Sequence, residues 1–244
     1  VDKVNISETD LSKRNFVKLI NPLGDDSSVM RTMLTPNMMD VLAKNYTKGN
    51  KDVKLFEIGR IFNNVAINCD GQPAEAEGLC IGMYGEDADF FALKGMIDQT
   101  MSLMGLGQPV YEAERNLPMY HPGRCANIIY EGELLGTIGE IHPDVSERYG
   151  IGTRVYSCEL LFSIIMLHTK SDVVYKPLPK YPAVTRDISL IVSEDVTVGA
   201  IEDVIFENGE KILEDVALFD VYRGRQVGEG KKSAAFALTY RDAE

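Results

Sequence analysis

KLFEIGRIFNN, at residues 54–64, reads as a buried strand that leads into a loop. Apolar side chains recur from Val53 to Phe62, a pattern typical of a strand at the centre of a sheet. The stretch ends in two amides, Asn63 and Asn64. Chemistry on a phosphate favours a cation at such a place, because a fixed positive charge stabilises the negative charge that develops. The stretch therefore raises two alternatives, an active site or the scaffold of a lost one.

The composition is that of a soluble globular protein with one large or two ordinary domains. Of its 244 residues, 45% are hydrophobic and 25% are charged. The sequence has no run of about 18 apolar residues, so we expect no membrane span. The formal net charge of −12 argues against sequence-independent binding of nucleic acid, DNA included, because that mode neutralises phosphates with Lys and Arg. The first residues carry neither a signal segment nor an initiator Met, so we expect a fragment of a longer chain.

Cysteines and histidines are scattered along the chain rather than paired in motifs. The cysteines are Cys69, Cys80, Cys125 and Cys158, and the histidines are His121, His142 and His168. The cysteines form no CxxC pair, which favours reduced thiols in a cytoplasmic protein. The histidines lack HExxH spacing, so no metal site is predicted.

Three prolines in KSDVVYKPLPKYPAVTRD, residues 170–187, mark a boundary between two domains. Proline disfavours regular pairing and favours an extended linker. We therefore place the first domain at residues 1–170, the linker at 171–183 and the second domain at 184–244. The first domain has many strand-like runs and few helices, which predicts a mostly antiparallel sheet of the α+β class. These runs are residues 16–20, 53–62, 78–84, 126–130, 134–141 and 155–162.

Two helices and one hairpin are predicted in the first domain. Residues 35–49, TPNMMDVLAKNYTKG, have Thr35 in position to cap a helix and Gly49 to end it. Residues 89–107, DFFALKGMIDQTMSLMGLG, have Asp89 as the cap and apolar residues at helical spacing. Residues 131–136, EGELLG, predict a tight turn between two strands.

The second domain reads as strand, helix, strand, strand. Its segments are RDISLIV at 186–192, TVGAIEDVIFENG at 197–209, LEDVALFDVYRG at 213–224 and KKSAAFALTYRD at 231–242. Thr197 is placed to cap the helix and Gly209 to end it. This order is three-quarters of a ferredoxin-like βαββαβ unit, truncated before its last helix and strand.

Period-two alternation places small and polar side chains on the open face of that second sheet. If Ile188, Leu190, Phe219, Val221, Phe236 and Leu238 face the helix, the open face carries Ser189, Asp220, Tyr222, Ser233, Ala235 and Ala237. A flat face with a tyrosine and hydrogen-bonding groups suits stacking of an unpaired base, which contributes about 1–3 kcal/mol per base. Basic residues flank the hairpin connection and are placed to hold phosphates, namely Arg223, Arg225, Lys231 and Lys232. The pattern alone leaves open a solvated face, or a face that packs on another domain.

Six motifs follow one another along almost the whole chain, beginning near Val4. They are NPLGDDSSVMRTMLTPNMMDVLAKN, KDVKLFEIGRIF, FFALKGMID, YHPGRCANI, LLGTIGEIHPDV and LPKYPAVTRDISLIV. In this order they resemble the C-terminal part of the bacterial phenylalanyl-tRNA synthetase beta subunit family. The resemblance implies a class II synthetase-like noncatalytic core domain and a ferredoxin-fold anticodon-binding domain. It also implies, motif by motif, that the anticodon contacts fall on Ser189, Asp220, Tyr222 and Ser233, the face that alternation selected.

The resemblance further implies that the core domain has lost its ATP site. In active class II synthetases a strand of this kind is followed by an arginine that grips the ATP α-phosphate, because its planar fork makes paired bonds to oxygen. Asn63 and Asn64 stand in those places here. The region where a second arginine is expected, YSCELLFSIIMLHTK at 156–170, contains neither glycine nor arginine. Arg31 is then expected to have a packing or ion-pairing role.

The sequence shows no other set of catalytic residues in place of the lost ATP site. The sequence has no Walker loop, nucleophile elbow or Ser-His-Asp order. Asp144, Glu147 and Glu133 read as solvated carboxylates. We therefore assign no catalytic residue.

Three hypotheses follow. In the first, the chain is a noncatalytic part of phenylalanine-tRNA ligase that scaffolds the alpha subunit in an (αβ)2 assembly and contacts the anticodon of tRNA(Phe). The resemblance then implies that the holoenzyme uses ATP and Mg²⁺. Methionines gather in patches that suit either packing at the subunit interface or an ordinary core, and the sequence leaves both open (Met30, Met33, Met38, Met39, Met96, Met101 and Met104). The second hypothesis is a stand-alone ferredoxin-like ligand-binding or regulatory protein. The third is an independent adenylate-forming enzyme, for which we expect no activity from this chain alone.

Overall fold

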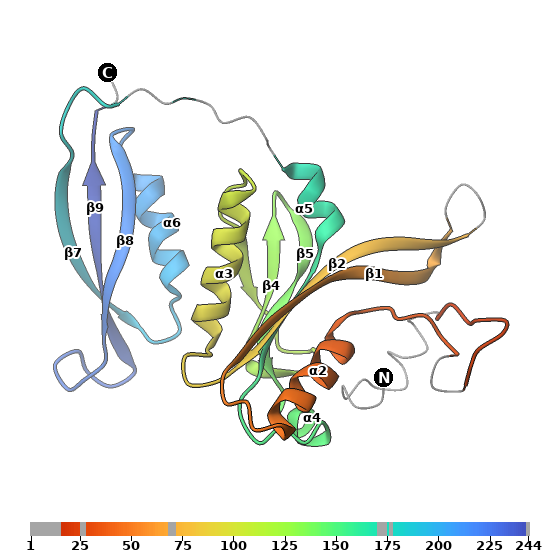
Figure 1. The fold of residues 1–244 in the computed structure, drawn as a ribbon. Helices are drawn as coiled ribbons and strands as arrows, with labels where there is room; N and C mark the ends of the chain where they lie inside the picture. The colour runs from red at the N-terminus through yellow and green to blue at the C-terminus, as the bar shows by residue number, and fades with distance from the viewer. Residues whose placement is uncertain (1–15, 25–27, 68–71, 170–174, 176–177, 243–244) are drawn as a thin grey trace. The chain divides into compact units, whose positions relative to one another are not determined.

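The computed structural model describes residues 16–24, 28–67, 72–169, 175 and 178–242, with the backbone alone for residues 63–67. The chain divides into two compact units, Val1–Val173 and Val174–Glu244 (Figure 1). Much of the predicted linker, residues 171–174 and 176–177, lies outside the described residues.

The first unit is built on a six-stranded antiparallel sheet in the order β1-β2-β6-β5-β4-β3. Its strands are β1 (Val53–Ile67), β2 (Pro73–Tyr84), β3 (Val110–Ala113), β4 (Tyr120–Tyr130), β5 (Glu133–Ile141) and β6 (Tyr156–Leu161). The helices described in this unit are α2 (Thr35–Thr47), α3 (Phe90–Leu103), α4 (Pro143–Arg148) and α5 (Phe162–His168). The predicted α+β class with a mainly antiparallel sheet is confirmed.

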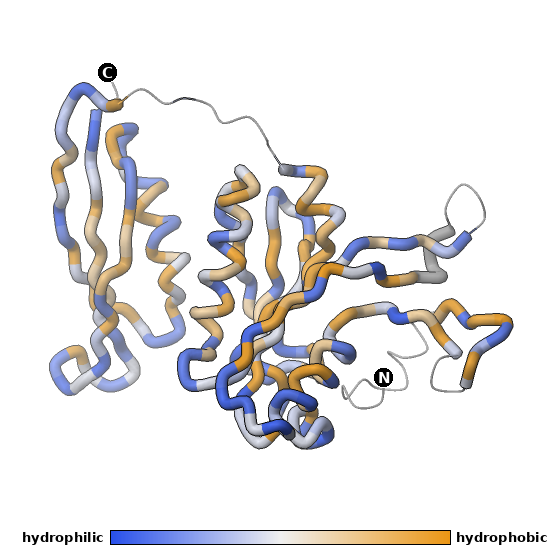
Figure 2. Tube along the Cα trace, in the orientation of Figure 1, coloured by the Kyte–Doolittle hydropathy of each residue, from blue (hydrophilic) through white to orange (hydrophobic). Residues whose placement is uncertain are grey.

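Helices cover both faces of this sheet, and each face has its own apolar core. On one face α2 packs over β2, in a core that includes Met38, Leu42 and Cys80. On the other face α3 packs over β5 and β6 and α5 packs over β2 and β5, in a core that includes Ile97 and Ile165. Figure 2 shows hydrophobic and hydrophilic positions alternating along α3, as expected for a helix with one buried face. Of the methionines for which the sequence left interface and core open, Met38, Met39 and Met101 are buried core residues.

The cap of α2 differs from the prediction. Thr35 is the first helical residue, and the N-cap position is held by Leu34, whose side chain cannot accept a hydrogen bond. A carboxylate from β6 takes that role: Glu159 accepts the backbone N–H groups of Leu34 and Thr35, each at 2.8 Å. The helix therefore depends on a residue distant in sequence to satisfy its first donors.

Other local predictions are confirmed. Asp89 caps α3 by accepting the backbone N–H of Ala92 at 2.6 Å. The turn between β4 and β5 has positive φ at both central residues, Glu131 (51°) and Gly132 (84°), the geometry of a tight hairpin. The strand predicted at residues 16–20 is wrong, because in that segment only an isolated bridge from Lys18 to Val29 is present.

The second unit has a three-stranded antiparallel sheet in the order β7-β9-β8, with one described helix on one face. Its elements are β7 (Val184–Ser193), α6 (Val198–Asn208), β8 (Leu213–Tyr222) and β9 (Lys231–Tyr240). Thr197 caps α6 by accepting the backbone N–H of Ala200, as predicted. Since β9 inserts between β7 and β8, the order matches the first four elements of the predicted ferredoxin-like unit.

Candidate functional site

The sheet of the second unit has an inner face, packed on α6, and an outer face. Phe236 and Leu238 of β9 point inward into the apolar core, so Ser233, Ala235 and Ala237 of the same strand lie on the outer face. Residues directly opposite each other in antiparallel strands share a face. Ser189 lies opposite Ala235 and Tyr222 lies opposite Ser233, so both also belong to the outer face.

A β-bulge in β8 brings Asp220 to the same outer face. Leu218 pairs with Phe236 on the inner side, and Asp220 pairs with the next residue of β9, Ala235, so Phe219 is the extra residue. The prediction that Phe219 faces the helix is wrong, because a bulge interrupts the alternation: its side chain is 59% exposed and is no part of the core. Beyond the bulge the alternation resumes with Asp220 and Tyr222 outward.

The four predicted contact residues therefore share one outer face. The hydroxyl oxygens of Ser189 and Ser233 lie 2.9 Å apart, and either can be the donor. Ala235 and Ala237 beside them have short side chains, so the surface of the sheet is flat there. The face joins a hydroxyl pair, an exposed carboxylate at Asp220 and an aromatic ring, without a bulky side chain in the central strand.

Gly224 fixes where the Tyr222 ring lies. A Cβ atom on Gly224 would overlap the phenol oxygen of Tyr222 and would come within 2.6 Å of its Cζ atom. The ring thus lies against the start of the β8–β9 connection, yet 43% of the residue is exposed. This role of Gly224 was not predicted from the sequence. The signal that could have indicated it is a glycine two positions after a tyrosine predicted to stack on a base.

The four predicted basic residues do not form one group. Arg225 and Lys231 are exposed, as a phosphate contact requires. Arg223 instead pairs with the Glu194 carboxylate at 2.8 Å. Lys232 is not placed to hold a phosphate as predicted. Alternation along β9 puts it on the inner side, where it is 6% exposed and donates to the backbone carbonyl of Glu194 at 2.9 Å.

The β1 stretch in the first unit has a structural explanation. Arg31 donates to the Glu57 carboxylate at 2.6 Å and to the backbone carbonyl of Arg60 at 2.8 Å. The predicted ion-pairing role of Arg31 is confirmed. The backbone of Asn63 pairs with Ala74, while the side chains of Asn63 and Asn64 lie outside what the structure describes. The candidate region of the second arginine forms β6 and α5, and its Glu159 is engaged in capping α2.

Three exposed carboxylates elsewhere in the first unit lie close to histidine rings. Glu131 and Glu133 each have an oxygen 3.3 Å from a ring nitrogen of His168, and both side chains are 57% exposed, so Glu133 is a largely solvated carboxylate, as predicted. Asp144 lies 3.7 Å from His142. Within the described residues no group of three or more His, Cys, Asp or Glu side chains is arranged to hold a metal ion.

The groups with shifted pKa values belong mainly to the interior. Burial, followed by the nearby Glu159, raises the pKa of the Cys80 thiol to about 12. Burial, followed by Glu114, raises the pKa of Cys125 to about 12. Burial also raises the pKa of Cys158 and of Tyr120. These groups stay neutral near pH 7 and are not activated nucleophiles.

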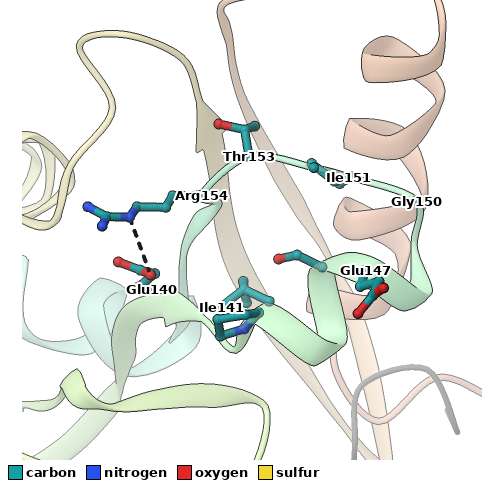
Figure 3. Close-up of a pocket in the computed structure, with 10 residues that line it drawn as sticks. Glu140, Ile141, Glu147, Gly150, Ile151, Thr153 and Arg154 are labelled. Carbon is teal, nitrogen blue, oxygen red and sulfur yellow. Dashed lines mark ion pairs between the residues drawn. The ribbon is translucent and has the colours of Figure 1, made fainter.

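Two concave surfaces of the first unit were not predicted from the sequence. One is an apolar groove of about 450 Å³ between β1, β2 and α3, lined on the strand side by Phe56 and Ile58. The other is a cavity of about 490 Å³ beside α4, where Glu140 and Arg154 face each other (Figure 3). No helix in the described residues combines the length and the apolar character needed to cross a bilayer.

Two family models match the chain. The model described as "Phenylalanyl tRNA synthetase beta chain CLM domain" matches residues 1–162, and the model described as "Ferredoxin-fold anticodon binding domain" matches residues 179–244. The second match covers the outer face built by β7, β8 and β9.

Curated relatives are similar over nearly the whole chain. A phenylalanine-tRNA ligase beta subunit of Clostridium acetobutylicum is 45% identical over 242 residues, which cover 99% of this chain and 30% of the relative. One from Clostridium tetani is 42% identical over 243 residues, covering 98% of this chain and 30% of the relative. The chain thus spans about 30% of the length of these relatives.

A solved structure is similar in fold. Pyrrolysyl-tRNA synthetase from Desulfitobacterium hafniense superposes with a TM-score of 0.54 at 16% sequence identity, over 68% of this chain and 57% of that one. At this identity the likeness concerns the fold alone, and it agrees with the class II synthetase-like sheet expected for the first unit.

Proposed function

Because the chain belongs to the phenylalanine-tRNA ligase beta subunit family, we propose that it is a noncatalytic part of that ligase. In this role its second unit contacts the anticodon of tRNA(Phe), and its first unit docks the alpha subunit within an (αβ)2 holoenzyme in the cytoplasm. ATP and Mg²⁺ act in the holoenzyme and not on this chain. Residues 1–170 are assigned to the core domain, 171–183 to the linker and 184–244 to the anticodon-binding domain.

One observation carries the anticodon proposal: Ser189, Asp220, Tyr222 and Ser233 share the flat outer face of a three-stranded sheet. An unpaired base stacks on an exposed aromatic ring, and its edge is read by hydrogen bonds. Asp220 supplies a carboxylate, which accepts from base N–H groups. The Ser189–Ser233 pair supplies hydroxyls that donate or accept as the base requires.

The charge of the chain limits how tightly this face holds RNA by itself. With a net charge of −12, the chain repels phosphates at long range. Of the four predicted basic residues, Arg223 is paired with Glu194 and Lys232 is buried, which leaves Arg225 and Lys231 exposed to the phosphates. Base contacts supply specificity, and phosphate contacts supply most affinity. We expect the isolated chain to bind tRNA weakly, and submicromolar affinity at physiological salt would contradict this.

The experiment that tests the anticodon proposal is titration of the chain with an RNA hairpin carrying the tRNA(Phe) anticodon loop. We expect Tyr222→Ala to weaken binding about tenfold, which corresponds to the loss of one stacked base. Tyr181→Ala is the matched control, since Tyr181 is an exposed tyrosine outside the outer face. Equal affinity of the Tyr222→Ala and unaltered chains, or of hairpins with scrambled anticodons, would overturn the proposal.

Subunit docking is supported by apolar side chains exposed beside the groove of the first unit. Phe56 and Ile58 on β1 line the groove and are 72% and 47% exposed. Large apolar side chains in such number on one unit favour a protein partner. Co-purification with the alpha subunit tests this, with Phe56→Glu expected to weaken the complex and Val110→Glu, on the exposed strand β3, as the control. If both variants assemble alike, the groove is not the contact.

A further inference from the structure

The two edges of the six-stranded sheet differ in length. One edge is β3, which has 4 residues, and the other is β1, which has 15 (Figure 1). An edge strand presents a row of unpaired backbone groups that readily pair with another strand, so proteins keep edge strands short or cover them. The β3 edge is short, whereas the β1 edge requires a cover.

The chain itself covers one half of the β1 edge. The backbone N–H of Phe62 donates to the carbonyl of Arg31 at 2.9 Å, and the carbonyl of Arg60 accepts from Nε of Arg31 at 2.8 Å. The backbone groups of Arg60 and Phe62 therefore point away from β2. In an antiparallel strand the N–H and C=O groups of one residue point to the same side, and that side alternates from residue to residue.

The other half of the β1 edge is open. Pairing of β1 with β2 runs without a register shift over residues 53–63, so the backbone groups of Lys54, Phe56 and Ile58 point to the same side as those of Arg60. Within the described residues no strand lies on that side of β1, and these backbone groups have no backbone partner there. The open half thus presents donors and acceptors at every second residue.

The side chains of the same residues line the apolar groove. Phe56 and Ile58 lie opposite Ile81 and Leu79 of β2, on the face of the sheet that carries α3. The groove measures about 450 Å³ and extends to Met96 of α3. A strand added to this edge would place its alternate side chains on the same face, beside Phe56 and Ile58.

The charge at the groove restricts the kind of segment that fits. Among the described residues that line it, Lys54 is the one charged residue, and it lies at the end where β1 begins. A carboxylate on a neighbouring strand is favoured next to a lysine, because opposite charges on adjacent strands attract. The open edge therefore fits an extended segment with alternate apolar residues and an acidic residue at one end.

We propose that an extended segment of the alpha subunit adds to β1 as a further strand and pairs with the backbone of Lys54, Phe56 and Ile58. Main-chain hydrogen bonds hold the segment, its apolar side chains cover Phe56 and Ile58, and its carboxylate pairs with Lys54. This mode of binding rests on the proposed docking of the alpha subunit and specifies which backbone groups that docking uses.

Hydrogen exchange of single amides, measured by NMR in the free chain and in its complex with the purified alpha subunit, tests the pairing. In the free chain we expect fast exchange at Phe56 and Ile58, and slow exchange at Leu55 and Glu57, whose amides point toward β2. Binding should slow exchange at Phe56 and Ile58 by a factor of about 10 or more. Unchanged exchange at both residues within a formed complex would overturn this proposal alone, whereas the absence of any complex would overturn the proposed docking as well.

The same measurement identifies a different occupant. If Phe56 and Ile58 become protected in the chain alone as its concentration rises, a second copy of the chain pairs with the edge, and the proposal is overturned. We expect no such concentration dependence.

Proline and alanine at one position separate the backbone contact from the side-chain contact. Lys54→Pro and Lys54→Ala both remove the ammonium group, but only proline removes the outward N–H. An edge strand tolerates proline where the N–H does not face the neighbouring strand, so we expect the two free variants to have similar Tm. Lys54→Pro should bind the alpha subunit several-fold more weakly than Lys54→Ala, because it loses one hydrogen bond more. Equal affinity of the two variants would refute the strand pairing.

Discussion

The Arg31 guanidinium donates to the Glu57 carboxylate at 2.6 Å, and this pair explains the EIGR sequence of β1. Gly59 lies two residues further along the strand, and a Cβ atom there would overlap the guanidinium of Arg31. The backbone carbonyl of Arg60 accepts from Nε of the same arginine at 2.8 Å. A stretch that resembles part of an active site thus holds a structural arginine in place.

Adding a methyl group at Gly59 should break this arrangement. We expect Gly59→Ala to lower the free energy of unfolding by about 1–2 kcal/mol, because Arg31 must leave Glu57 and the Arg60 carbonyl. In an Arg31→Met background the same change should cost less than about 0.5 kcal/mol, since the overlapping group is gone. Urea unfolding of the four proteins in this cycle measures the coupling.

The control for this cycle is Gly95→Ala. Gly95 lies within α3, and no atom is within 4 Å of the position its Cβ would take. Alanine there should stabilise the chain by up to about 1 kcal/mol, because glycine is a poor helix former. Additive effects of Gly59→Ala and Arg31→Met would contradict the explanation.

Removing the Glu159 carboxylate should loosen α2. Glu159→Ala leaves the N–H groups of Leu34 and Thr35 without their acceptor, so we expect a loss of about 2–3 kcal/mol in the free energy of unfolding. Denaturant unfolding measures this loss. Glu112→Ala, on exposed strand β3, is the matched control and should change stability by less than about 0.5 kcal/mol. Equal effects of the two changes would show that the cap contributes nothing.

Displacing the Tyr222 ring should weaken RNA binding without altering any contact residue. Gly224→Ala forces the ring away from its place, so we expect several-fold weaker binding of the anticodon hairpin, with Tm changed little. Gly199→Ala in α6 is the control, because its Cβ would meet no atom within 4 Å. Unchanged affinity in Gly224→Ala would mean that the ring position does not matter for the RNA.

Stability should fall at alkaline pH. The folded-state pKa of Cys80 and of Cys125 is about 12, whereas an ordinary thiol titrates near 9.0. The unfolded chain therefore releases protons first as the pH rises, and the free energy of unfolding decreases between about pH 9 and pH 12, by up to about 1.4 kcal/mol per pH unit and group. Urea unfolding from pH 7 to pH 11 checks this. Cys125→Ala should flatten the decrease, and a constant stability from pH 8.5 upward in the unaltered chain would contradict it.

Sequence patterns predicted elements well where the cause of the structure is local. The strand at residues 53–62 became β1, and Asp89 and Thr197 cap the helices that follow them. Each of these features depends on side-chain alternation or on a cap within three residues. The same holds for the outer face, since alternation along β9 alone placed Ser233 correctly.

Features that depend on distant residues could not be predicted. The cap of α2 comes from Glu159, and the ion pair of Glu140 with Arg154 joins β5 to a loop that follows α4. The bulge at Phe219 has no signature in β8 itself, because it arises from pairing with β9. Lys232 is a different case. Alternation along β9 already places it on the inner side with Phe236 and Leu238, and only its bond to the backbone carbonyl of Glu194 depends on the fold.

The Glu159 cap also has a consequence for the order of events during folding. Thr35 and its acceptor are separated by 124 positions in the sequence. Closing so long a loop is slow and entropically costly, so such a contact forms after local ones. The N-terminal turn of α2 should therefore still be frayed in the folding transition state, with φ-values near zero at Glu159, while the β4–β5 hairpin is already formed. Loss of the cap would then accelerate unfolding and leave the folding rate nearly unchanged.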